Sequence, residues 1–261
     1  MALHLCVLGS GSSGNCTFIG SGTTGVLIDA GFSGKETVRR LEEAGLTMQA
    51  VHAVCISHEH ADHTAGIGVL HRRFNLPLYA NSGTIEALAS NDGSLKLPWR
   101  VFTNGTPFRV GDLCIEPFSV PHDAYDPVGF VVGTKDGGRV GIVTDMGIST
   151  ALIRERLRGC RAVVIEANHD EELVKNADRP WSLKQRILGR QGHLSNAGAA
   201  ATVVDIAGPG LQHVYLAHLS KDCNRGELAL RTARKALDKA GHSHVKVSLT
   251  FPDKTSEVWK E

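Results

Sequence analysis

One stretch of six residues constrains this chain more than any other, because it places three imidazoles and a carboxylate where a strand meets a helix. The stretch is His58-Glu59-His60-Ala61-Asp62-His63. An apolar run at 51–56 precedes it and is typical of a buried strand, and a helix is expected from Thr64 onward. Polar groups at this density cannot all be buried without partners. They either face solvent or converge on a cation, and His with carboxylate at short spacing is what divalent metals require.

Alternation along the turn divides these side chains into two groups. His58 and His60 form one group, and Asp62 and His63 form the other. One turn could therefore hold one ion and the next turn a second ion. The spacing does not match H-E-x-x-H, so a helical zinc-protease site is not indicated. A polar surface loop is the competing interpretation, which the density of donors disfavours.

The composition is that of a globular protein with no dominant charge. The chain has 261 residues, 42% of them hydrophobic, and a formal net charge of +1. That charge excludes a strong global attraction to nucleic acid or an anionic membrane, so any such binding must use local patches. We see no short repeat, low-complexity tract or linker, and we expect a single domain over residues 1–261.

The cysteines and the N-terminal sequence favour a cytoplasmic protein. The 6 cysteines contain no C-x-x-C pair and lie mostly in apolar runs, as expected of free thiols in a reducing compartment. The N-terminus enters a strand at once, without the features of a signal peptide. No apolar run approaches the length needed to cross a bilayer, so no membrane association is expected.

Periodicity and capping signals predict an alternation of strands and helices. Strands are expected at 3–8, 16–20, 26–31, 51–56, 76–80, 101–102, 108–110, 113–120, 128–133, 140–144, 162–165, 213–217, 245–249 and near 258. Helices are expected at 35–44, from 64, and at 82–89, 149–158, 182–188, 196–207 and 224–240. Ser149 is the expected cap of its helix, and Ser182 and Asn224 begin capping-box patterns. Loops are expected at 91–98 and 135–138.

Five loci share one feature, which is a His or Asp directly after a predicted strand. They are Asp29, the 58–63 cluster, His122, Asp145 and His218. Strand ends at one edge of a sheet are where layered α/β proteins collect functional groups. Each residue alone has an ordinary explanation as a helix cap or a surface group. Their joint occurrence favours a common site.

This pattern resembles the metallo-β-lactamase superfamily, whose H-x-H-x-D-H signature is the 58–63 cluster. The resemblance spans almost the whole chain and implies the α/β class, as a four-layer αββα sandwich with two divalent metal ions between the sheets. It implies these ligands of the first ion: His58, His60 and His122. It implies these ligands of the second ion: Asp62, His63 and His218. Asp145 would bridge both ions, and Asp29 would orient the cluster from behind.

Further segments look like the YycJ/WalJ branch of that superfamily, which is associated with 5′→3′ exonuclease activity on DNA. These segments are 9–15, 168–170, 182–188, 192–196 and 218–220. Asp145 stands where class B β-lactamases have Cys, and His60 stands where flavodiiron oxidoreductases have Glu. The segment between Asp145 and His218 is too short for the cap domain of the β-CASP nucleases.

Two neighbouring cations would share a water and lower its pKa, which supplies a bridging hydroxide near neutral pH. We therefore count Asp62 and Asp145 among the catalytic residues. The leaving oxygen needs a metal or an acid. His193 is the first candidate for that acid, or for a phosphate donor, and His169 is the second. Both histidines could equally be surface groups or supports of the cluster.

Candidate substrate-binding residues are polar or basic and lie near these loci. They are Ser12, Asn15, Asn168, Lys184, Arg186, Ser195 and Asn196. A Gly/Ser loop can expose amides to an anion, and a helix N-terminus favours a phosphate. A hairpin connection, N-capping and a solvated helix face are the competing interpretations. The aromatic content of 5% does not suggest an extensive base-stacking platform.

The leading hypothesis is a dinuclear metal phosphodiesterase, acting on DNA as a 5′→3′ exonuclease. The alternative is a hydrolase of small lactones, esters, phosphotriesters or β-lactams on the same two-metal site, and a non-catalytic binding module is a third. The ligand set suits zinc, and also manganese or iron. The sequence does not indicate the oligomeric state.

Overall fold

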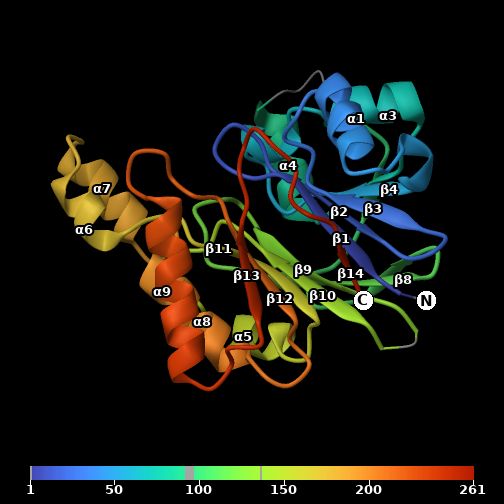
Figure 1. Cartoon of the computed structure of the whole chain (residues 1–261). Helices are drawn as coiled ribbons and strands as arrows, with labels where there is room; N and C mark the ends of the chain where they lie inside the picture. The colour runs from blue at the N-terminus through green and yellow to red at the C-terminus, as the bar shows by residue number, and fades with distance from the viewer. Residues whose placement is uncertain (1, 92–96, 136) are drawn as a thin grey trace.

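Two seven-stranded sheets pack face to face, and helices cover the outer face of each sheet (Figure 1). This computed structural model describes residues 2–91, 97–135 and 137–261. The layers run helices, sheet, sheet, helices, which is the order predicted from the sequence.

The first sheet has the strand order β14-β1-β2-β3-β4-β5-β6. Its strands are β1 (His4–Gly9), β2 (Cys16–Gly20), β3 (Gly25–Ile28), β4 (Ala53–Cys55), β5 (Leu78–Ala80), β6 (Trp99–Val101) and β14 (Trp259–Lys260). From β3 to β6 the strands are parallel. The helices associated with this sheet are α1 (Gly34–Glu43), the 3-10 helix η1 (Met48–Ala50), α2 (Ala61–Thr64), α3 (Ile67–Phe74) and α4 (Ser82–Asn91).

The second sheet has the strand order β13-β12-β11-β10-β9-β8-β7. Its strands are β7 (Phe108–Val110), β8 (Leu113–Ser119), β9 (Val128–Gly133), β10 (Arg139–Val143), β11 (Ala162–Glu166), β12 (His213–Ala217) and β13 (Lys246–Leu249). From β10 to β13 the strands are parallel. The helices that follow its strands are α5 (Ala151–Leu157), α6 (Glu171–Asn176), α7 (Trp181–Leu188), α8 (Asn196–Ile206) and α9 (Gly226–Lys239).

Three apolar layers hold this stack together. The central layer fills the space between the sheets and includes Leu5, Phe130 and Tyr215, each fully buried. The other two layers lie between each sheet and its helices. Truncating a buried residue of this size to alanine costs about 2–5 kcal/mol, so the packed sheets form a rigid support for the loops at their edges.

The predicted strands all occur, with ends that differ by a few residues, but several helix starts were wrong. The cap of α5 is Thr150 rather than Ser149. The N-cap of α7 is Pro180, with no side-chain cap, so Ser182 is not the first turn's acceptor. Asn224 lies one residue before the true N-cap of α9, Arg225, because its amide is engaged elsewhere.

Two predicted loops fall partly on residues that the structure does not describe. The loop predicted at 91–98 includes 92–96, and the turn predicted at 135–138 includes 136; both lie outside the described residues. The helix expected from Thr64 is two helices, α2 and α3. The sequence reading missed α6 entirely. Among the described residues, no helix has the length and apolar character needed to cross a membrane.

Candidate metal centre

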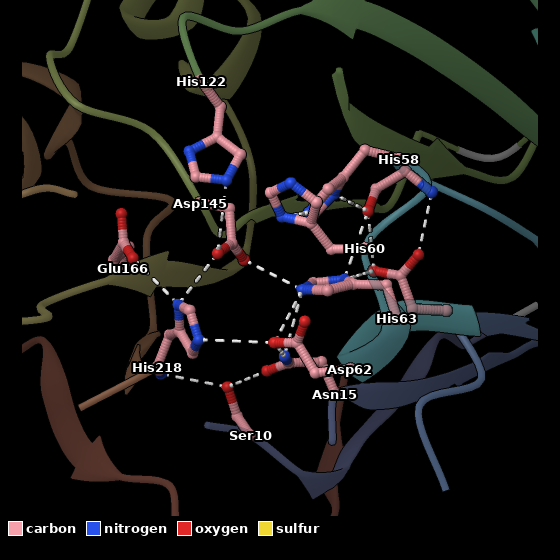
Figure 2. Close-up of polar contacts among 12 residues, drawn as sticks. Ser10, Asn15, His58, His60, Asp62, His63, His122, Asp145, Glu166 and His218 are labelled. Atoms are coloured by element: carbon pink, nitrogen blue, oxygen red, sulfur yellow. Dashed lines mark hydrogen bonds and ion pairs between the residues drawn. The ribbon is translucent and has the colours of Figure 1, made fainter. Parts of the chain in front are cut away.

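Three residues at the ends of central strands adopt a backbone conformation that is uncommon outside glycine. Asp29, Asp145 and His218 have φ of 62°, 53° and 54°, just beyond the ends of β3, β10 and β12. A non-glycine residue in this left-handed region stores about 1–3 kcal/mol of strain, which persists when surrounding contacts fix it. Asp145 and His218 point into one polar cluster between the sheets (Figure 2).

The first group of this cluster is formed by His58, His60 and His122. The Nε2 atom of His58 lies 3.1 Å from Nδ1 of His60. The His122 ring centroid lies 5.2 Å from that of His58 and 5.1 Å from that of His60. One nitrogen from each residue lies within 4.8 Å of the others. The strand-end loop of the first sheet and the loop after β8 thus bring three imidazoles together.

The second group is formed by Asp62, His63 and His218. Asp62 Oδ2 lies 3.6 Å from His63 Nε2 and 3.7 Å from His218 Nε2. Asp145 lies between the two groups, because its Oδ2 is 3.1 Å from His63 Nε2 and its Oδ1 is 3.9 Å from His122 Nε2. The structure therefore brings together every residue that the sequence reading assigned to the two ions (Figure 2).

Asp29 supports the cluster from the side of the first sheet. His63 Nδ1 donates to Asp29 Oδ2 at 2.8 Å. The amide and hydroxyl of Ser57 donate to the same carboxylate at 2.8 and 2.9 Å. Because Nδ1 of His63 donates its hydrogen bond to Asp29, the Nε2 atom of His63 is left facing Asp62 and Asp145. A carboxylate behind a histidine in this way orients the ring as a metal ligand and raises its basicity.

The Gly/Ser loop between β1 and β2 supports the opposite side. Ser10 Oγ donates to Asn15 Oδ1 at 2.8 Å and accepts from the amide of His218 at 3.0 Å. Asn15 Nδ2 donates to Asp62 Oδ2 at 3.1 Å. Asn15 is buried and reaches the cluster itself, whereas Ser12 is exposed on the surface of the loop.

The sequence reading missed Glu166, the last residue of β11, as a part of this site. Its fully buried carboxylate accepts from Nδ1 of His193 at 2.8 Å and from Nδ1 of His218 at 2.9 Å. The amides of Met146 and Leu194 also donate to it, at 2.9 and 3.0 Å. Burial raises the pKa of Glu166, but the neighbouring His193 and His218 lower it to about 2. The sequence feature that could have identified Glu166 is its position as an acidic residue at the end of an apolar strand.

The electrostatics of the cluster separate its histidines into two kinds. Burial lowers the pKa of His58 well below its ordinary value and also lowers that of His122. These rings are therefore neutral, which is the form that coordinates a metal. Burial also lowers the pKa of His218, but the carboxylates of Asp145 and Glu166 outweigh it and raise that pKa to about 10. A cation that binds at His218 must displace a proton.

Unpartnered atoms show that the residues fit a metal. The buried Nε2 atoms of His122 and His218 have no hydrogen-bond partner among the described residues. Leaving such an atom unsatisfied costs about 1–3 kcal/mol, and both atoms border Asp145 or Asp62. Coordination to a cation would satisfy them. The imidazole and carboxylate donors suit zinc, manganese or iron.

His193 and His169 differ in their relation to the cluster. The His193 ring centroid lies 5.3 Å from that of His122 and 5.2 Å from that of His218, and its side chain is 25% exposed. His169 is buried, and its Nδ1 atom has no hydrogen-bond partner within the described ranges. His193 thus borders the candidate ligands with access to solvent.

Three other predicted substrate-binding residues make hydrogen bonds within the protein. Asn168 Nδ2 donates to the carbonyl of His218 at 2.7 Å, and Asn196 pairs with Asn224 at 2.8 Å. Ser195 is the N-cap of α8 and accepts from the amide of Gly198.

The two basic candidates lie on α7. Lys184 donates to the carbonyl of Lys175 at 2.7 Å. Arg186 is 63% exposed and pairs with Asp123, the residue after His122. Of the two, Arg186 is therefore the one that reaches the edge of the cluster.

Comparisons with known proteins agree with the fold. The family described as "Beta-lactamase superfamily domain" matches residues 24–219. Exodeoxyribonuclease YycJ of Bacillus anthracis is 37% identical over 242 residues, covering 92% of this chain and 91% of that protein. Exodeoxyribonuclease WalJ of Streptococcus pneumoniae (strain D39) is 37% identical over 240 residues, covering 90% and 88%.

A solved structure shows the same architecture. The metallo-β-lactamase fold protein YhfI of Bacillus subtilis matches with a TM-score of 0.74 and 17% identity, covering 100% of this chain and 99% of that one. The predicted αββα fold and superfamily are confirmed. The chain therefore belongs to the β-lactamase superfamily and, within it, to the family of YycJ and WalJ.

Proposed function

We propose that this chain is a metal-dependent hydrolase that uses two divalent ions to cleave the phosphodiesters of DNA, as a 5′→3′ exonuclease. The observation that carries the proposal is the convergence of imidazoles and carboxylates from both sheets around Asp145. Its family supports a metal-dependent hydrolase, and two relatives that match most of the chain are named exodeoxyribonucleases.

The cluster offers two adjoining sets of donors. The first ion would be held by His58, His60, His122 and Asp145. The second ion would be held by Asp62, His63, His218 and Asp145. Bound divalent ions would lower the pKa of a water and neutralise charge on the phosphodiester oxygens. Asp29 and Glu166 hold the rings of His63 and His218 in place for this.

His193 is suited to give a proton to the leaving oxygen. Its Nδ1 atom donates to Glu166, so the ring orientation is fixed and Nε2 is the atom left for substrate. Burial lowers the pKa of His193, but Glu166 outweighs it and the net pKa is raised. The raised pKa favours the protonated ring, which is the form that a general acid needs.

A substrate panel tests the proposal. Protein reconstituted with zinc, manganese or iron should release nucleotides progressively from the 5′ end of DNA that carries a label at either end. Esters, lactones, phosphotriesters and β-lactams should not be turned over at comparable rates. Intact DNA together with rapid hydrolysis of any of these small substrates would reject the nuclease assignment.

Asp145→Asn is the matched variant for the site, because Asn tolerates the left-handed backbone that this position requires. The variant should stay folded and lose activity by a factor of about a hundred or more, since it removes the one carboxylate shared by both donor sets. Undiminished activity in a folded Asp145→Asn protein would reject a two-ion site.

A further inference from the structure

A cavity of about 530 Å³ opens beside the metal cluster and is lined in part by His193. Its walls include Gly11, Asp123 and Ser220, which follow Ser10, His122 and Leu219 in the chain. Ser10 and His122 both contact the cluster, and Leu219 adjoins His218. The cavity therefore adjoins the candidate metal site, and His193 lies at the boundary between them. Its volume lies in the range of about 300–1,000 Å³ that is usual for small-molecule sites.

Three cations line this cavity. Arg186 lies on α7, and Arg179 lies in the segment before that helix. Lys221 lies in the loop after β12. Lys221 makes no ion pair with any described residue, so its charge is available to a ligand. Arg179 pairs with Asp222, and Arg186 pairs with Asp123.

Both arginine pairs are open to exchange. The Asp222 side chain is 61% exposed, and the Arg186 side chain is 63% exposed. Exposed pairs of this kind contribute about 0–1 kcal/mol. A phosphate accepts two parallel hydrogen bonds from a guanidinium and carries more charge than one carboxylate, so it can replace either aspartate.

The remaining walls suit the rest of a nucleotide. Ser12 and Ser13 are exposed on the Gly/Ser loop and offer hydroxyl donors to the same cavity. Leu183, Ile187 and Leu219 supply an apolar wall for a sugar and a base. Among the described residues that line the cavity there is no Phe, Tyr or Trp, and the only aromatic ring is the imidazole of His193, so a base would be held without a stacking platform and without a choice of sequence.

We propose that this cavity binds the 5′-terminal nucleotide of a DNA strand through its terminal phosphate. This inference rests on the proposed function and assigns the feature that makes the cleavage exonucleolytic. The terminal phosphate is held by Lys221, Arg179 and Arg186, and the next phosphodiester along the strand reaches the metal cluster.

The chemistry of that step is self-consistent. The oxygen of water forms a bond to phosphorus, and the bond from phosphorus to the O3′ atom of the terminal nucleotide breaks. His193 lines the cavity that holds this nucleotide, so it is placed to give O3′ its proton. The products are a nucleoside 5′-monophosphate and a strand that again ends in a 5′-phosphate, which is ready to enter the same cavity.

A binding experiment tests this without cleavage. Two oligonucleotides of one sequence, with and without a 5′-phosphate, are titrated into the full chain in the presence of a chelator, and fluorescence anisotropy gives the two affinities. The phosphorylated strand should bind at least about tenfold tighter, as expected for a charge-assisted contact to phosphate. A deoxynucleoside 5′-monophosphate should compete, and the corresponding deoxynucleoside should not.

Two variants link that preference to the cavity. Lys221→Gln and Arg179→Gln should each reduce the ratio of the two affinities several-fold, and Lys221→Gln should lower the salt dependence of binding to phosphorylated DNA by about one ion. Arg231→Gln is the control, because Arg231 is exposed on α9 and lines a different surface. That variant should keep the wild-type ratio.

The outcomes separate this inference from the proposed function. Equal affinity for the two ends, including no measurable affinity for either, would overturn the cavity assignment. So would an unchanged ratio in folded Lys221→Gln and Arg179→Gln proteins. If metal-loaded protein still degraded DNA in those cases, the nuclease proposal would stand alone; if it degraded none, the nuclease proposal would fail separately.

Discussion

At the scale of single residues, the site depends on strained backbone at strand ends. Asp29, Asp145 and His218 all adopt the left-handed region, and each adjoins a parallel strand buried on both faces. Asn, Asp and His tolerate this region better than most residues, and His218 is also held there by its bonds to Ser10, Asp145 and Glu166. Packing of the sheets therefore maintains a geometry that the local sequence disfavours.

Asp29→Asn tests the support that this carboxylate gives to His63. Asn keeps the left-handed backbone and can still accept from the amide of Ser57, but its NH₂ group cannot accept the proton of His63 Nδ1. Metal affinity, measured by competition with a chromophoric chelator, should fall about 10–100-fold. Asn75→Asp is a matched control, because Asn75 is also left-handed but caps α3. Equal affinities in wild type and Asp29→Asn would show that Asp29 does not orient the ligand.

His213 gives a prediction for stability that is independent of the site. It begins β12, is buried, bonds Ser248 at 2.9 Å and stacks on Tyr215. Burial, followed by the charge of Lys246, lowers its pKa from 6.5 to about 4. The unfolded chain therefore binds more protons between these values. The stabilisation is complete above pH 6.5 and is lost as pH falls toward 4.

The loss can be measured by comparison with His213→Gln, whose side chain does not titrate. Between pH 7 and pH 4, urea unfolding should show that wild type loses about 2 kcal/mol more free energy of unfolding than the variant, after allowance for solvent screening. Parallel losses in the two proteins would mean that His213 is protonated in the folded state.

At the scale of elements, the α6–α7 arm, residues 171–188, is weakly anchored to the rest of the fold. Figure 1 shows it standing out from the body beside α8 and α9. No residue of α7 is fully buried, whereas α8 buries Ala199, Ala200 and Val203. Exposed ion pairs at Arg179 and Arg186 connect the arm region to the loops around the cavity. Few buried contacts and weak pairs give an element that opens more easily than the body.

Amide hydrogen exchange tests this difference. The amides of α7 should exchange faster than those of α8, because local opening costs less there. Phosphorylated DNA added in the presence of a chelator should slow exchange in α7 and leave α9 unchanged, since the ligand contacts Arg186. Equal protection of α7 and α8 in the free protein would contradict the assignment of the arm as weakly anchored.

The same arm shows where sequence patterns lose information. Apolar runs predicted the strands well, because burial on both faces requires a continuous apolar sequence. The start of α7 at Trp181 was missed because Pro180 sets it without a side-chain cap. Asn224 gave a false capping signal because it bonds Asn196, 28 residues away. Contacts between residues this far apart produce no pattern in the local sequence.

At the scale of the whole molecule, the candidate centre joins the two sheets. His58, Asp62 and His63 follow β4 of the first sheet, while Asp145 and His218 follow strands of the second. A cation held by both sets would cross-link the halves of the sandwich in the folded state only. Metal binding should therefore stabilise the entire fold, because a ligand that binds only the native state shifts the folding equilibrium.

Metal removal should lower the melting temperature. With metal at about 1,000 times its Kd, the stabilisation is about 4 kcal/mol, which corresponds to roughly 10 °C in a chain of this size. Differential scanning fluorimetry with a chelator, and after readdition of zinc or manganese, measures the shift. Asp145→Asn should show a much smaller shift. A melting temperature that changes neither with chelator nor with added metal would argue against a site between the sheets.

The sequence predicted the candidate metal ligands more completely than the residues that hold those ligands in place. The 58–63 cluster is dense enough to be recognised locally, and His122, Asp145 and His218 stand out as polar residues after apolar runs. Glu166 was missed because it is neither a His nor an Asp, the residue types of that pattern, and because its contacts come from His193 and His218, far along the chain. Hydrogen bonds between distant loops are set by tertiary packing, which a one-dimensional pattern does not record.

The division of the cluster between the sheets also determines when it can exist during synthesis. The first histidines leave the ribosome early, but Asp145 and His218 belong to strands made much later, and β12 must pair with β11 before His218 is positioned. A nascent chain that ends before His218 therefore holds an incomplete cage. Translation itself therefore delays assembly of the complete cluster until most of the polypeptide has emerged.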